Sequence, residues 1–262
     1  MKHLAMRSKS MRRGDRPFTT PGLGDRVHSA MLGYLYALEH NEPVTIHLTR
    51  DKNDKPHKRQ SWGEIMTLFP KGMLTYKVHA DVENLPESEW LAYLKDAGYD
   101  AATYYYKDTE RHHPNDPPHD VPREDLVEIS SLINRGYKLL RGNDDYRMLL
   151  PDRFITTQWD TNDPGRQFRN VDAILNNYRE QGLSVLVVGG KAEIPDLKEI
   201  GWIGYAMSRA VAHVGIDSAM LHMASLYMKP ENIHLYNNGG FTSHHLIRGV
   251  NNGMKLNPYA FS

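Results

Sequence analysis

Apolar residues in the second half of the chain form short continuous runs that alternate with runs at helical spacing. Continuous runs predict β-strands, whereas apolar residues three and four positions apart predict helices with one buried side. The predicted strands are 153–159, 183–188, 211–216 and 232–236. Of these, 183–188 is apolar enough to be buried on both faces, and 232–236 is the last. The predicted helices are 171–181, 203–212 and one that ends at Met228.

The first half carries the same two patterns. Its predicted strands are 44–49, 73–80 and 101–106, and its predicted helices are 26–39, 62–69, 87–97 and 123–141. Strands that alternate with helices favour parallel sheets joined by crossover helices. We therefore predict an α/β chain of two Rossmann-like lobes with mostly parallel sheets.

Two changes in composition set the predicted domain limits. The polar stretch Gly142-Asn143-Asp144-Asp145 puts a boundary near residue 150, which gives lobes at 17–150 and 151–262. Residues 1–16 hold six basic side chains against Asp15 alone. We interpret this basic N-terminal segment as a solvated tail or edge segment; the functional alternative is a contact with an anionic acceptor or nucleotide.

Composition excludes several classes of protein. The 262 residues carry a formal net charge of zero, so no whole-molecule field gathers nucleic acid. The absence of cysteine excludes disulfides, a thiolate nucleophile and Cys-ligated zinc. No apolar run is long enough to span a bilayer, and the N-terminus lacks the apolar core of a signal peptide. We expect a soluble, cytoplasmic protein without a membrane span.

The stretch 211–225 combines a strand, a turn glycine and a helix start. Gly215 allows backbone geometry that other residues resist, and Asp217 or Ser218 can cap the following helix. The first turn of that helix has unpaired N–H groups and the positive end of the helix dipole, which suit a phosphate. His222 lies one turn further in. An ordinary capped helix with a satisfied histidine is the structural alternative.

Other polar loops supply candidate ligands. Pro21-Gly22-Leu23-Gly24-Asp25 is predicted to be a tight loop that leads into a helix, with Asp25 at the junction. Arg166 and Arg169 follow a predicted strand and could pair with an anion. The histidines and aspartates of 107–122 could bind a metal, but four prolines among them favour an exposed loop. The nucleotide fingerprints G-x-G-x-x-G and Walker A are missing, as is the G-x-S-x-G hydrolase elbow.

Two motifs give the chain a family resemblance. Gly24-Asp25-Arg26-Val27-His28-Ser29-Ala30 resembles the N-terminal loop and first helix of glycosyltransferases related to ADP-heptose:lipopolysaccharide heptosyltransferases. The run from Val214 to Ala224 resembles their C-terminal G-x-D-S-G-x-x-H-x-A motif, with Ala219 in place of the usual glycine. The resemblance implies a GT-B architecture, in which two Rossmann-like lobes face a central cleft.

The resemblance also implies an activity and a site. It implies inverting, metal-independent transfer of a hexosyl or heptosyl group from a nucleotide-diphosphate sugar to a glycan or lipid-linked saccharide, with no further cofactor. Asp25 is the expected catalytic base. The expected donor-binding residues are Gly24, Arg166, Asp217, Ser218, Ala219 and His222. Among these, Asp217 is expected to organise the loop, and His222 to donate a hydrogen bond to a donor oxygen.

Two other functions stay open at this point. The same reaction could act on modified DNA bases, for which the basic N-terminal segment is the supporting feature. The chain could also be a non-catalytic nucleotide- or glycan-binding module of the same fold, which its short length and Ala219 allow.

Overall fold

The computed structural model describes residues 1–6, 22–50, 61–82, 85–105, 126–128, 140–161, 166–168, 170–237 and 255–258. The chain divides into a first unit, Met1–Gly136, and a second unit, Tyr137–Ser262. Each unit is built on a five-stranded sheet in which every described strand pair is parallel. The division thus falls before the boundary predicted near residue 150.

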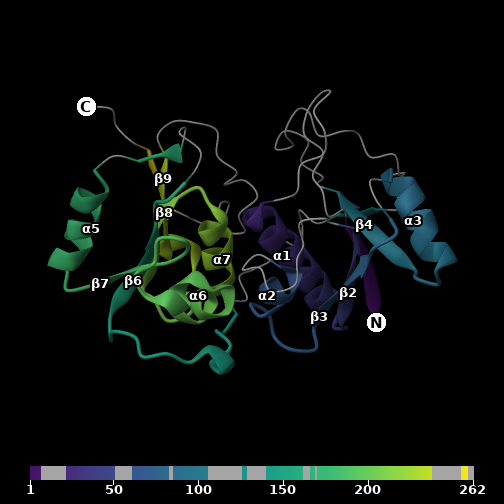
Figure 1. Ribbon diagram of the computed structural model, residues 1–262, viewed down its shortest axis with the longest axis horizontal. Helices are drawn as coiled ribbons and strands as arrows, with labels where there is room; N and C mark the ends of the chain where they lie inside the picture. The colour runs from purple at the N-terminus through teal and green to yellow at the C-terminus, as the bar shows by residue number, and fades with distance from the viewer. Residues whose placement is uncertain are drawn as a thin grey trace. The chain divides into compact units, whose positions relative to one another are not determined.

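The first unit has the strand order β3-β2-β1-β4-β5. Helices α1 and α2 lie on one face of this sheet and α3 lies on the other (Figure 1). The elements are β1 (Lys2–Met6), α1 (Leu23–His40), β2 (Val44–Thr49), α2 (Trp62–Met66), β3 (Leu74–His79), α3 (Glu87–Asp96), β4 (Ala101–Tyr105) and β5 (Leu126–Glu128).

The structure corrects the prediction of a solvated N-terminal segment. Strand β1 is the central strand of the first sheet, where it pairs with both β2 and β4. Leu4, Ala5 and Met6 are buried because both neighbouring strands and both helical layers cover them. These three apolar residues are a short run next to many basic ones, so the charge concealed the strand. Residues 7–16 lie outside the described part of the chain.

The predicted helix 123–141 is also wrong where the structure describes it. Leu126–Glu128 form β5, which pairs with Thr103–Tyr105 of β4. Leu140 and Arg141 are not helical either. The helix prediction relied on leucines and isoleucines at helical spacing, but these residue types also occur in strands, and pairing with β4 decides for the strand.

The second unit has the strand order β10-β9-β8-β6-β7. Helix α5 covers one face of the sheet, while α6 and α7 cover the other (Figure 1). The elements are β6 (Phe154–Gln158), α5 (Val171–Glu180), β7 (Ser184–Val187), α6 (Ile200–Met207), β8 (Ala212–Ile216), α7 (Ala219–Tyr227), β9 (Ile233–Asn237) and β10 (Lys255–Pro258).

Two predictions about these strands are wrong. Strand β7 is at the edge of the sheet, and its residues are exposed or half-buried instead of buried on both faces. Strand β9 is not the last strand, because Lys255–Pro258 add β10 beside it. The Asn-, Gly- and Pro-rich composition after β9 concealed this strand.

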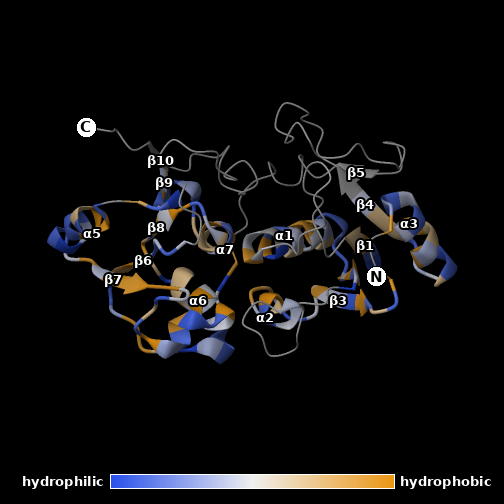
Figure 2. Cartoon of the chain, turned by 45° about the horizontal axis from the view of Figure 1, so that its top comes forward, coloured by the Kyte–Doolittle hydropathy of each residue, from blue (hydrophilic) through white to orange (hydrophobic). Residues whose placement is uncertain are grey.

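The helices differ in how deeply they are packed. Every residue of α7 from Met220 to Tyr227 is buried, whereas α5 buries fully only Leu175. Helix α5 packs that leucine against Ile155, Leu183 and Val214 of the sheet, and its other residues are largely hydrophilic, as are those of α3 (Figure 2). Helix α7, like α6, is therefore an interior helix, whereas α5 lies at the surface of the second unit. Within the described ranges, no helix is long and apolar enough to cross a membrane.

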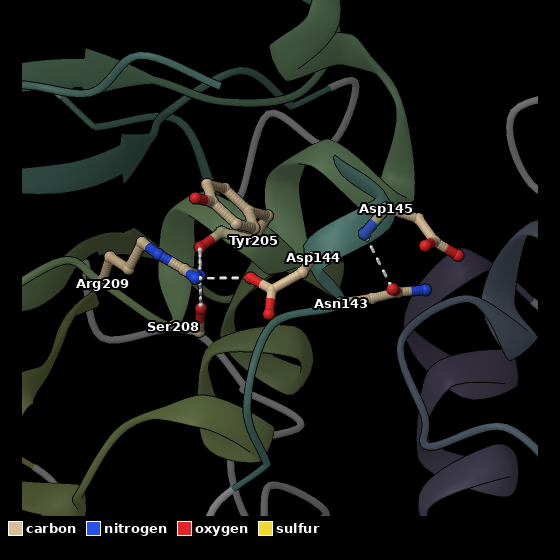
Figure 3. Close-up of polar contacts among 6 residues, drawn as sticks. All are labelled: Asn143, Asp144, Asp145, Tyr205, Ser208 and Arg209. Carbon is tan, nitrogen blue, oxygen red and sulfur yellow. Dashed lines mark hydrogen bonds and ion pairs between the residues drawn. The ribbon is translucent and has the colours of Figure 1, made fainter. Parts of the chain in front are cut away.

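Asp144, Tyr205 and Arg209 form a polar cluster, here called the clasp, that holds the start of the second unit on α6 (Figure 3). Asp144, in a 3₁₀ turn, accepts a hydrogen bond from Arg209 Nη2 at 3.1 Å. The Arg209 guanidinium lies 3.5 Å from the centre of the Tyr205 ring. Beside it, Gly201 packs so closely on the Tyr146 ring that a Cβ would come within 2.4 Å of it. The clasp holds this turn on the helix.

Candidate functional site

The second sheet has a topological switch point between β6 and β8. After β6 the chain continues through α5 to β7 on one side, whereas β8 and β9 lie on the other side of β6. Loops that leave the carboxyl ends of two such strands diverge to opposite faces and leave a crevice in which ligands of α/β proteins bind. The loops after Gln158 and after Ile216 therefore define the candidate site.

The loop after β8 starts an interior helix with a serine cap. Ser218 has extended backbone angles, and its Oγ accepts a hydrogen bond from the backbone N–H of Met220 at 3.2 Å. Ala219 is the first helical residue, and both Ser218 and Ala219 are partly accessible. The remaining N–H groups of the first turn present partial positive charge to this edge of the sheet.

Gly215 sets the spacing of the two central strands. A Cβ at this position would lie 2.5 Å from the carbonyl oxygen of Gln158 on β6. Any larger residue would push β8 away from β6 where their loops diverge. Gly215 is therefore needed for the close approach of two strands, and not for the turn geometry that its place in the motif predicted.

Arg166 joins the two loops across the switch point. Its Nη1 donates to the backbone carbonyl of Asp217 at 3.1 Å and lies 3.8 Å from the Asp217 carboxylate. The Asp217 side chain is 3% exposed, while that of Arg166 is 36% exposed. The buried carboxylate thus holds a guanidinium that is still open to solvent. Of the two residues predicted as possible caps, Ser218 is the cap and Asp217 contacts the arginine.

His222 lies one helical turn beyond Ser218 and is buried in α7. The structure therefore brings Arg166, Asp217, Ser218 and Ala219 together and places His222 behind them on the same helix. Arg169 lies outside the described residues.

Gly24 and Asp25 belong to the first unit. Helix α1 begins at Leu23, and Arg26 N–H donates to the carbonyl of Gly22, so both residues are in the first helical turn. The predicted loop with Asp25 at the junction is wrong in this respect. This turn follows β1 at the switch point between β1 and β4 of the first sheet. The side chain of Asp25 lies outside the described part of the chain.

An aromatic cluster that the sequence pattern does not reveal lies at the same edge of the second sheet. The rings of Trp159, Phe168 and Tyr236 lie with their centres 5.4 to 5.6 Å apart. They come from the end of β6, the loop beyond Arg166 and the end of β9. Only the sheet register brings them together. The predicted histidine-rich loop 107–122 lies outside the described residues, and among the described ones no three His, Cys, Asp or Glu side chains are arranged so that they could hold a metal ion.

These features define the class of fold. Two successive Rossmann-like units, with a capped helix at the switch point of the second, match the fold of heptosyltransferase-like GT-B structures. Among solved structures, the chain is similar to E. coli ADP-heptose LPS heptosyltransferase II, with a TM-score of 0.56 and 10% identity. The match covers 100% of this chain and 92% of the other. At this identity the similarity concerns the fold.

Another similar structure is the bacterial iron-containing dodecameric glycosyltransferase TibC from enterotoxigenic E. coli H10407. Its TM-score is 0.47 at 12% identity, over 92% of this chain and 61% of the other. No protein-family model and no curated protein matches the sequence.

Proposed function

We propose that the protein is a glycosyltransferase that moves a hexosyl or heptosyl group from a nucleotide-diphosphate sugar to a saccharide acceptor. The observation that carries this proposal is the hydrogen bond from Arg166 to Asp217, which places the guanidinium beside the Ser218-capped start of α7 at the β6/β8 switch point. A diphosphate suits this place because an accessible guanidinium and helix N–H groups both favour negative charge. The GT-B fold supports the same choice of ligand.

The proposed reaction is a single displacement at the anomeric carbon. Asp25 accepts the proton of an acceptor hydroxyl, whose oxygen forms the new bond to the anomeric carbon. The bond from that carbon to the diphosphate oxygen breaks, and the nucleoside diphosphate leaves with the electron pair. Attack from the side opposite the leaving group inverts the configuration.

The chain's own groups are proposed to stabilise the departing diphosphate. Negative charge grows on its oxygens as the bond breaks, and preorganised donors aimed at such charge are a large source of catalysis. Arg166 and the first N–H groups of α7 would supply these donors, while Asp217 keeps the guanidinium in place. His222 would donate a hydrogen bond to a donor oxygen. We therefore propose that transfer needs no metal ion, and activity that survives a chelator would support this.

A turnover assay tests the catalytic part of the proposal. The full chain is incubated with ADP-, GDP-, UDP- and TDP-sugars and saccharide acceptors, and release of nucleoside diphosphate is measured. We expect Asp25→Asn to lower turnover by about 10²- to 10⁴-fold, because that is the usual contribution of a general base. Asp100→Asn is the matched control, since Asp100 is an exposed carboxylate that precedes β4 at the opposite edge. Equal turnover of the two variants would remove Asp25 from the mechanism.

A calorimetric titration tests the binding part separately. Arg166→Gln should weaken nucleoside diphosphate binding by at least about tenfold, because hydrogen bonds to charged groups contribute about 1.5–3 kcal/mol. Arg179→Gln is the control: Arg179 is exposed and ends α5 just before β7, at the amino edge of the sheet. An unchanged dissociation constant for Arg166→Gln would remove it from the site. Binding without turnover of any donor would favour the non-catalytic module.

A further inference from the structure

Three histidines form a hydrogen-bonded row across the first sheet. His3, His47 and His79 lie on the adjacent strands β1, β2 and β3, on the face that α3 covers. His3 Nδ1 is 3.0 Å from His47 Nε2, and His47 Nδ1 is 2.9 Å from His79 Nε2. Both ring nitrogens of His47 are therefore engaged. We refer to these three residues as the histidine row.

Helix α3 closes over one end of the row. The His79 ring makes edge-to-face contacts with Trp90 and Tyr93 of α3, with ring centres 5.2 and 5.5 Å apart. His47 is fully buried and His79 is 6% exposed. Tyr99, which follows α3, has its ring centre 4.4 Å from that of His47. The row is thus enclosed between the sheet and the α3 segment.

The charged groups around the row do not compensate for its burial. Burial lowers the pKa of all three histidines most; beyond it, His79, His3 and then Lys77 lower that of His47, Lys77 lowers that of His79, and the N-terminal amine lowers that of His3. Asp81 raises the pKa of His79 and Asp100 that of His3, but burial is the largest influence on each and lowers it. On α3, the Tyr93 hydroxyl donates a hydrogen bond of 3.2 Å to the Asp81 carboxylate.

Hydrogen counting limits the charge that this geometry accepts. Each N···N contact holds one hydrogen, so three neutral imidazoles fill both contacts in either direction along the row. One extra proton is tolerated, because a doubly protonated His47 donates to both neighbours. A second extra proton puts two N–H groups against each other in at least one contact. The closed row therefore carries at most one positive charge.

We propose that the histidine row is an acid-sensitive lock in the first unit, which holds α3 on the sheet until a second proton enters the row. In the open state, all three imidazoles are exposed and each binds a proton below its ordinary pKa of about 6.5. Opening in acid is thus coupled to the uptake of at least two protons. The lock is fully closed above that pKa and weakens as the pH falls below it.

Hydrogen exchange of the full chain between pH 4 and 5.5 tests the lock. The opening constant of peptides from α3 and β1–β3 is obtained after correction for the intrinsic exchange rate at each pH. Uptake of two protons, the minimum that the hydrogen count allows, increases this constant about 100-fold per pH unit, and uptake by a neutral row increases it more. In His47→Gln, whose amide can donate to one neighbour and accept from the other, one proton fewer is taken up. The expected increase is then about tenfold per pH unit.

Two further variants keep the test decisive. If His47→Gln does not fold, His3→Gln replaces a half-exposed member at the end of the row and should reduce the pH dependence by the same factor. His40→Gln removes an exposed histidine at the end of α1 and should leave the 100-fold dependence unchanged. The proposal is overturned if the row variants keep the parent's pH dependence. It is also overturned if histidine NMR shows two of the row's imidazoles protonated while α3 stays protected.

Discussion

Single side chains fix the ends of elements at the candidate site. Ser218 satisfies the N–H of Met220, and Asp217 fixes Arg166 across the switch point. A change of one residue therefore alters the start of α7 or the position of the guanidinium without removing the sheet beneath them.

At the residue scale, we expect Ser218→Ala to lower the free energy of unfolding by about 1 kcal/mol, because the helix loses its cap. Ser218→Asp should retain most of the stability, since its carboxylate accepts the same hydrogen bond. Urea denaturation measures both. Ser184→Ala, at an exposed position on β7, is the control and should change stability much less. Equal effects at the two positions would argue against the cap.

A second expectation concerns His213 on β8. This residue is completely buried, its Nδ1 is 3.0 Å from Thr156 Oγ1, and burial and the nearby His234 lower its pKa to about 3. In the unfolded chain its pKa returns to about 6.5, so the unfolded state binds more protons between these values. Stability is retained above pH 6.5 and falls by about 1.4 kcal/mol per pH unit as the pH drops toward 3.

Denaturant titrations from pH 7 to 4 check this expectation. His213→Leu is close in size and does not titrate, so the fall in stability with decreasing pH should be smaller in this variant by about 1.4 kcal/mol per pH unit. A variant with the same pH dependence as the parent chain would show that His213 is protonated within the fold.

The sequence predicted the residues of one motif better than the contacts between distant residues. It indicated the helix start at Ser218 because caps and turn glycines are local signals. It did not indicate the histidine row, because His3, His47 and His79 are separated by whole elements and only the register of three strands aligns them. The start of α1 was also misplaced, since Gly24 suggested a loop where the helix had already begun.

At the element scale, α6 needs a glycine at position 201, where the Tyr146 ring packs against it beside the clasp. Gly201→Ala places a methyl group against the Tyr146 ring, so we expect a loss of about 1–3 kcal/mol. In a Tyr146→Ala background the same change should become stabilising by about 0.5–1 kcal/mol, because alanine favours a helix over glycine. Thermal and urea unfolding of the parent chain, the two single variants and the double variant gives the double-mutant cycle. Equal effects in both backgrounds would show that the two residues do not interact.

The sequence predicted elements well where apolar runs were long or strictly periodic. Strands β2, β3, β4, β6 and β8 and helices α1, α3, α5 and α7 occur where the pattern placed them, with ends shifted by a few residues. Strands β1, β5 and β10 are short, and each lies within a stretch whose charge, spacing or composition favours another structure. Their pairing partners decide their conformation, and a local pattern does not contain those partners.

At the scale of the whole molecule, each unit has its own sheet and its own core. We expect a nucleoside diphosphate to stabilise the second unit, since the proposed phosphate contacts all belong to it. At a concentration one hundred times its dissociation constant, the ligand should contribute about 2.7 kcal/mol. Calorimetry with hydrogen exchange as a local readout measures the gain, and Arg166→Gln should reduce it. A gain in stability confined to the first unit would show that the nucleotide does not bind at the Arg166 site.

The sequence predicted the large-scale class of the molecule, two successive Rossmann-like units, because alternating strands and helices leave few other arrangements. It did not predict strand order. That order depends on whether each crossover places the next strand on one side of the sheet or on the other. The facing cleft of the GT-B architecture stays a prediction, as does the part that Asp25 takes in it.

The position of β1 at the centre of its sheet also affects how the protein is made. This strand leaves the ribosome before either of its two partners, which start at residues 44 and 101. During synthesis, both edges of β1 stay unpaired, and its apolar residues stay uncovered, until β2 and β4 have been made. Contacts between residues so far apart in the chain form slowly. The central strand of the first unit therefore cannot complete its pairing until β4 has emerged.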